Sequence, residues 1–98
     1  MQTIKSILSS YQDVETVYLF GSRAKGNFRL GSDVDLAIMN EGVSTKTVTK
    51  LQNEFIDSSL PFRIDLVDFS SLTEQEFIDH INRVGIPFYK QGVLIELT

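Results

Sequence analysis

The stretch from residue 19 to residue 39 constrains the fold most, because it joins two apolar segments through a glycine–serine turn and a basic loop. The first segment, residues 17–20, has the length and the apolar side chains of a buried strand, and Gly21-Ser22 ends it. The second segment begins at Asp33-Val34-Asp35 and stays apolar as far as Met39. We therefore expect two strands connected by a loop that carries charged residues near the strand ends.

Asp33 and Asp35 share one face of the second predicted strand, because successive side chains of a strand point to opposite faces. Two carboxylates about 4 Å apart repel each other by roughly 4 kcal/mol at an effective dielectric constant of about 20. Either one of them binds a proton, as in an acid–base dyad, or a cation bridges the pair. Hard cations such as Mg²⁺ prefer oxygen ligands and are held by carboxylates together with substrate phosphates. A solvated strand end is the alternative for this pair taken alone.

The Gly21-Ser22 turn has the features of an anion site. Glycine lets a ligand approach the backbone closely, and Ser22 can cap the short helical turn at residues 23–25, whose free N–H groups would face an anion. Arg23, Lys25 and Arg29 place three of the nine basic residues beside this turn. An ordinary strand–turn–helix connection would also fit Gly-Ser alone. Together with the acidic pair, however, the turn predicts a site for a metal-bound nucleoside triphosphate.

Composition excludes several classes of protein. The chain has 98 residues, 42% of them hydrophobic, which suits a single domain over residues 1–98 with a modest core. Absence of cysteine excludes disulfides and zinc–thiolate sites. No apolar run approaches the ~20 residues of a membrane span, and the first residues lack a signal-peptide pattern, so we expect a cytoplasmic protein without a membrane partner. A net charge of −4 argues against binding to extended nucleic acid.

The remaining pattern predicts helices that alternate with strands, in an α/β (α+β) fold with a small mixed sheet of about three to four strands. A Ser-Leu-Thr-Glu capping box at residues 71–74 and Gly85 mark the ends of the last helix. The expected helices are residues 3–12 (within an N-terminal segment 1–12), 44–58 capped by Ser44 or Thr45, and the helix ending at Gly85; the expected strands are 15–20, 33–39 and 62–68, with 92–98 as an edge strand or a tail.

Asp65 is the candidate for a third acidic site residue. It lies in the third predicted strand on the face opposite the apolar side chains of Ile64 and Leu66. A two-metal site needs a further carboxylate near the acidic pair, and Asp65 supplies it if the second and third strands are adjacent. An ion pair with a basic neighbour is the alternative role for Asp65. We expect Glu54 and Asp57 to be solvated, and His80, the single histidine, to be a surface helix residue.

The chain resembles the minimal nucleotidyltransferases, which belong to the DNA polymerase β-like superfamily. Their signature is Gly-Ser, ten residues, then Asp-x-Asp, and here Gly21-Ser22 is followed by the ten residues 23–32 and Asp33-Val34-Asp35. The flanking text, Leu-Phe-Gly-Ser-Arg-Ala-Lys-Gly and Ser-Asp-Val-Asp-Leu-Ala, is also typical of the family. The resemblance implies a palm-like fold over nearly the whole chain.

The resemblance also implies roles for the site residues. The acids Asp33, Asp35 and Asp65 would be catalytic and would hold two Mg²⁺ ions. ATP or another nucleoside triphosphate would be the substrate, and Asp65 could also accept a proton from the attacking hydroxyl. The residues expected to bind its phosphates are Gly21, Ser22, Arg23 and Lys25.

Single-domain relatives are commonly paired with a small helical protein that has a HEPN (higher eukaryote and prokaryote nucleotide-binding) domain. The resemblance therefore implies an antitoxin that attaches AMP to a tyrosine of a HEPN-type toxin. Two alternatives remain open: a catalytically idle module that neutralises its partner by contact, and a transferase that acts on a small molecule or an RNA end. A homodimer or a hetero-oligomer is compatible with the apolar C-terminal segment.

Overall fold

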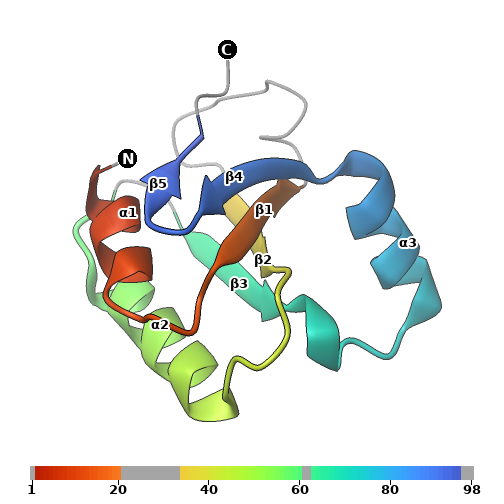
Figure 1. The fold of residues 1–98 in the computed structure, drawn as a ribbon, viewed down its shortest axis with the longest axis horizontal. Helices are drawn as coiled ribbons and strands as arrows, with labels where there is room; N and C mark the ends of the chain where they lie inside the picture. The colour runs from red at the N-terminus through yellow and green to blue at the C-terminus, as the bar shows by residue number, and fades with distance from the viewer. Residues whose placement is uncertain (1, 21–33, 61–62, 96–98) are drawn as a thin grey trace.

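The computed structural model describes residues 2–20, 34–60 and 63–95, and their strands form one mixed five-stranded sheet with helices on both faces (Figure 1). The strand order is β3-β2-β1-β4-β5. The elements are α1 (Gln2–Ser9), β1 (Thr16–Phe20), β2 (Val34–Ile38), α2 (Thr45–Asp57), β3 (Ile64–Asp68), a 3-10 helix (Phe69–Ser71), α3 (Gln75–Val84), β4 (Ile86–Lys90) and β5 (Val93–Leu94).

Pairing within the sheet places β2 beside β3, as the third acidic site residue requires. β1 runs antiparallel to both β2 and β4, and β5 forms an antiparallel edge next to β4. β2 and β3 are parallel, and α2 makes the crossover between them. The prediction that the second and third strands are adjacent is therefore confirmed.

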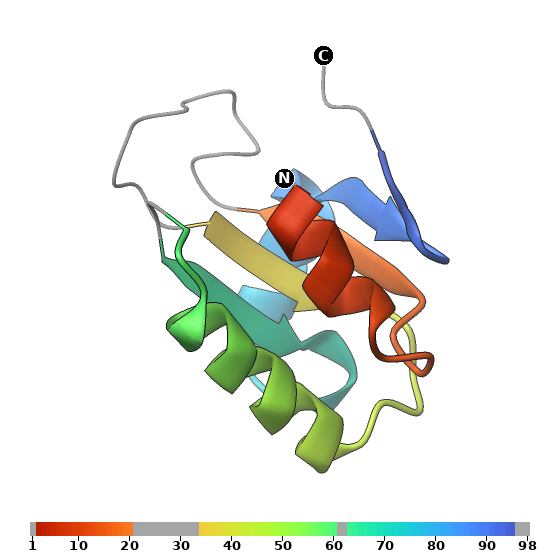
Figure 2. The same ribbon diagram turned by 90° about the vertical axis from the view of Figure 1, so that its left-hand side faces the viewer.

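The two faces of the sheet are covered unequally. Figure 2 shows α1 and α2 on one face and α3 behind the other. The α1–α2 face carries the larger apolar cluster, whose fully buried members include Leu8, Leu36 and Leu51. On the α3 face the buried cluster is small, with Phe20, Ala37 and Ile81 at its centre. No helix within the described ranges has both the length and the apolar character to cross a membrane.

The alternation predicted for the strands is confirmed. Val34, Leu36 and Ile38 are buried in the cluster under α1 and α2. Ala37 lies on the opposite face, under α3, and the parity of β2 places Asp35 on that face too. In β3, Ile64 and Leu66 pack on the first cluster, and Val67 packs on the second. Since Asp65 has the parity of Val67, both described acids lie on the α3 face.

The sheet has five strands, more than the expected three to four. The additional strand is β4, which the sequence pattern does not predict. Residues 86–90 follow the end of α3, where Ile86-Pro87 resembled a simple helix stop. Proline lacks an N–H and is tolerated in a sheet at edges and irregularities. Here Pro87 pairs with Tyr18, where the β1–β4 register shifts. Inside the sheet, Phe88 and Tyr89 are buried, and burial raises the pKa of Tyr89, partly offset by a hydrogen bond with the Gly92 backbone.

The helix ends agree with the sequence signals at two of three places. Ser44 caps α2 through its hydroxyl, which accepts a 3.1 Å hydrogen bond from the Thr47 backbone N–H. The capping box at residues 71–74 is wrong, because Ser71 belongs to the 3-10 helix and α3 begins at Gln75. The Asp68 carboxylate caps that 3-10 helix instead, accepting from the Ser70 backbone N–H at 3.2 Å.

Gly85 ends α3, as predicted, but through close packing rather than a left-handed conformation. Its φ is −68°, and its N–H donates to the Ile81 carbonyl at 2.7 Å. A Cβ at this position would lie 2.5 Å from that carbonyl oxygen and 3.2 Å from the Tyr18 side chain. The turn from α3 into β4 therefore needs glycine because there is no space for a side chain.

Candidate functional site

Three side chains from neighbouring strands lie in one row on the α3 face of the sheet. Phe20 of β1 pairs with Asp35 of β2, and Asp35 pairs in parallel register with Asp65 of β3. Paired residues on strands about 4.8 Å apart present their side chains to the same face. The fold thus brings two of the three predicted acids side by side, next to the last residue before the predicted phosphate turn.

Asp65 also has the basic neighbour that the alternative interpretation proposed. Arg63 Nε lies 3.4 Å from Asp65 Oδ1, and the two side chains are 76% and 41% exposed. Exposed ion pairs contribute only about 0–1 kcal/mol to stability, because water and mobile side chains compete with them. The ion pair is therefore too weak to exclude another role for the carboxylate.

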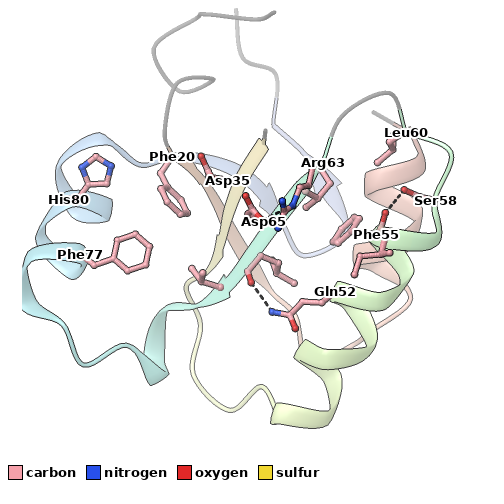
Figure 3. Close-up of a pocket in the computed structure, with 14 residues that line it drawn as sticks. Phe20, Asp35, Gln52, Phe55, Ser58, Leu60, Arg63, Asp65, Phe77 and His80 are labelled. Carbon is pink, nitrogen blue, oxygen red and sulfur yellow. Dashed lines mark hydrogen bonds and ion pairs between the residues drawn. The ribbon is translucent and has the colours of Figure 1, made fainter. Parts of the chain in front are cut away.

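A cavity of about 1040 Å³ contains both acids (Figure 3). It extends from α3, across the two carboxylates and over β3, to the C-terminal end of α2. Phe20, Phe77 and His80 line its α3 side, whereas Phe55, Ile56, Ser58 and Leu60 line its α2 side. The hollow is large enough to hold a small-molecule substrate, for which sites of about 300–1,000 Å³ are usual.

His80 belongs to this cavity, although we expected a surface helix residue. Its side chain is half-buried, and its ring meets Phe20 edge-on, with centroids 6.3 Å apart. Phe77 also contacts the Phe20 ring, with ring centroids 5.7 Å apart. The sequence does contain a signal that His80 faces the sheet. His80 lies three residues after Phe77 and four before Val84, which places it on the apolar stripe of α3.

Five of the predicted site residues lie outside the described part of the chain. They are Gly21, Ser22, Arg23, Lys25 and Asp33. The described strands end and begin beside them, at Phe20 and Val34. The phosphate-binding role and the first acid of the pair therefore remain predictions.

Asp35 and Asp65 fit a hard divalent cation, because they offer two carboxylates from adjacent strands on one face. Within residues 2–20, 34–60 and 63–95, no group of three or more His, Cys, Asp or Glu side chains could hold a metal ion. The predicted third ligand, Asp33, lies outside these ranges. The described part of the chain thus contains two carboxylates of the donor type that the prediction requires, and their role as ligands stays a prediction.

The acids on α2 are exposed, as expected, and one of them has a structural role. Glu54 accepts a 2.6 Å hydrogen bond from the Tyr11 hydroxyl, which links α2 to the segment after α1. This hydrogen bond, followed by desolvation, raises the pKa of Tyr11. Asp57 is exposed near the same helix end. Neither acid lines the cavity that holds Asp35 and Asp65.

Comparisons with known proteins show the family of this chain. A family model described as "Polymerase beta, Nucleotidyltransferase" matches residues 2–92. A relative from Haemophilus influenzae, "Probable protein adenylyltransferase MntA", is 34% identical over 94 residues, which are 95% of this chain and 82% of the relative.

Two solved structures show the same fold at lower identity. One, a toxin–antitoxin crystal structure with AMP-PNP, has a TM-score of 0.71 and 23% identity, covering 91% of this chain and 72% of the other. The second is a tri-AMPylated HEPN toxin of Shewanella oneidensis in complex with MNT antitoxin, with a TM-score of 0.60 and 20% identity, covering 91% and 71%. By its match over residues 2–92 and its likeness to MntA, the chain belongs to the polymerase beta nucleotidyltransferase family.

Proposed function

We propose that this chain is a Mg²⁺-dependent protein adenylyltransferase that acts in the cytoplasm as the antitoxin of a HEPN-domain toxin. It would transfer AMP from ATP to a hydroxyl of that toxin, most simply a tyrosine. Support comes from the name of the H. influenzae relative, a probable protein adenylyltransferase, and from the toxin–antitoxin complexes among the structural neighbours.

The observation that carries the proposal is the parallel register of Asp35 with Asp65. Two carboxylates on one sheet face, inside a substrate-sized cavity, are an arrangement suited to phosphoryl chemistry in which charge must be neutralised. Asp33, Asp35 and Asp65 would hold the cations, whose chemistry is to neutralise phosphate charge and to lower the pKa of a bound hydroxyl.

The other residues would position the reactants. Gly21, Ser22, Arg23 and Lys25 would bind the β- and γ-phosphates. The acceptor oxygen would form a bond to the α-phosphorus, the bond from that phosphorus to the β-phosphate's bridging oxygen would break, and pyrophosphate would leave. Asp65 would receive the acceptor's proton.

Replacing Asp35 by asparagine tests the proposal. The assay contains ATP labelled at the α-phosphate, Mg²⁺ and the product of the neighbouring gene, which the proposal expects to be a HEPN-domain protein. The wild type should label that protein, whereas Asp35→Asn should not. Asp57→Asn removes an exposed carboxylate outside the cavity and should keep wild-type transfer. Transfer by Asp35→Asn at the wild-type rate would refute the site.

Neutralisation by contact alone is the second candidate, and the Arg63–Asp65 ion pair favours it, because Asp65 already has a partner in the chain. In that case the wild type should form a tight complex with the HEPN-domain protein and leave it unlabelled. The labelling experiment therefore separates the two candidates.

A further inference from the structure

The carboxylates of Asp35 and Asp65, called the carboxylate row below, lie between two halves of the cavity. The two halves are lined by different elements of the fold. On one side, Phe20, Phe77 and His80 form a wall between β1 and α3. Gly21, the first residue of the predicted phosphate turn, directly follows Phe20 in the chain. A triphosphate bound by that turn would therefore leave its pyrophosphate on the β1 side of the row.

The other half lies over the outer edge of β3. The strand order places β3 at the end of the sheet, so that no further strand of the described chain covers its outer edge. Gln52 of α2 reaches that edge, and its amide donates to the Leu66 carbonyl at 3.0 Å. Beyond the carboxylates, this half is lined by the last turn of α2 and by Ser58 and Leu60 after it.

An unusually exposed apolar side chain stands at this edge. Ile56 is 76% exposed, more than any other large hydrophobic side chain within the described ranges. Leu60, half-buried, lines the same half of the cavity, and Arg63 stands beside it with most of its side chain in water. Exposed apolar side chains next to an arginine fit a protein-docking site, because such sites have an apolar centre and are enriched in arginine.

The in-line geometry of phosphoryl transfer determines which half of the cavity holds the nucleotide and which half receives the acceptor hydroxyl. Attacking and leaving oxygens lie roughly in line on opposite sides of the transferred phosphorus. If pyrophosphate leaves on the β1 side, the acceptor hydroxyl must arrive from the β3 side. Asp65, the proposed proton acceptor, is the acid on β3, so it is the one nearer to the acceptor side, which agrees.

We propose that the acceptor protein docks over the outer edge of β3 and the last turn of α2, with Ile56 as its main apolar contact. This inference rests on the proposed function, because it assigns the acceptor side of the same site. The occupant is a folded protein with an apolar surface patch around its acceptor hydroxyl, and the nucleotide occupies the opposite half.

Ile56→Ala is the decisive variant, because alanine favours a helix and the exposed side chain contributes little to the fold. With the HEPN-domain protein as acceptor, we expect its KM to rise about tenfold or more, as the loss of three buried carbons implies. The kcat should be unchanged, because Ile56 touches no reacting atom. Ile56→Asp should raise the KM further.

Val93→Ala is the matched control. Val93 is 61% exposed and lies on β5, at the opposite edge of the sheet. Its replacement should leave the KM for the acceptor within twofold of wild type. Both variants should bind a non-hydrolysable ATP analogue as the wild type does, and should keep its melting temperature.

Three outcomes would overturn the docking surface: an unchanged acceptor KM in both Ile56 variants, an equal loss in Val93→Ala, or a weakened affinity for the ATP analogue in Ile56→Ala. Failure of the proposed function looks different, since the wild type itself would then label no protein. The affinity of the Ile56 variants for the unlabelled acceptor, measured by calorimetry, would still test the surface.

Discussion

Replacing Asp65 by asparagine should separate stability from activity. The substitution keeps the shape of the side chain and removes its charge, and with it the ion pair to Arg63. That pair is long, at 3.4 Å, and its members are 76% and 41% exposed. We therefore expect the free energy of unfolding to change by about 0–1 kcal/mol, the usual value of an exposed pair.

The effect on transfer should be far larger. A positioned general base contributes on the order of 10²–10⁴-fold to a rate, and a lost metal ligand would add to that deficit. Urea denaturation measures the stability, and transfer of labelled AMP to the HEPN-domain protein measures the rate. A large rate loss with nearly constant stability would identify Asp65 as a group that serves the reaction.

Arg63→Gln is the control for kcat, measured at saturating acceptor so that a change in docking does not enter, because it breaks the same ion pair and leaves the carboxylate in place. If the pair itself mattered, both variants would lose activity to a similar extent. A rate in Asp65→Asn within about tenfold of wild type, below the usual contribution of a general base, would refute the role assigned to this residue.

Two further predictions concern the fold. Gly85→Ala should destabilise the protein by about 1–3 kcal/mol, the cost of forcing an extra carbon into a packed site, because the added Cβ would lie 2.5 Å from the Ile81 carbonyl oxygen; thermal unfolding measures this, and Asn82→Ala on the exposed face of α3 should have little effect. The raised pKa of Tyr11 means that its hydrogen bond to Glu54 stabilises the fold fully below the tyrosine's unfolded pKa and is lost as the pH rises through its folded pKa. Tyr11→Phe should therefore weaken the protein at neutral pH, and the difference from wild type should disappear at strongly alkaline pH; a difference that stays constant would contradict this cause.

Most of what the sequence predicts about the described site comes from the alternation of side chains between the two faces of a strand. The alternation in residues 34–38 and 64–67 assigned Asp35 and Asp65 to the face opposite the apolar core, and both assignments are confirmed. Parity works here because a shift of one residue would turn every apolar side chain of the strand to the wrong face. It is a local rule that needs no knowledge of the neighbouring strands.

The missed features depend on contacts between distant segments. The sequence does not predict β4, because a proline is unusual in a strand inside a sheet. Pro87 is accommodated where the β1–β4 register shifts, opposite Tyr18. The predicted start of α3 is wrong because Asp68 caps a 3-10 helix that includes Ser71. Ser71 therefore cannot cap α3 as the capping box requires. His80 could have been found from its helical spacing, but its link to the acids passes through Phe20, which is 60 residues earlier in the chain.

The unequal packing of the two faces follows from the position of the acids. Asp35 and Asp65 line the open cavity, where water or a cation can reach them, and closing apolar side chains over charged groups would cost several kcal/mol in lost hydration. The α3 face therefore cannot be closed over the two acids, and its buried cluster is limited to Phe20, Ala37 and Ile81, with Val67 of β3 only partly buried against it. Apolar burial must then come from the opposite face, where α1 and α2 cover the sheet and most of the buried side chains gather. The thick core under α1 and α2 thus provides the stability that allows the other face to remain open over the site.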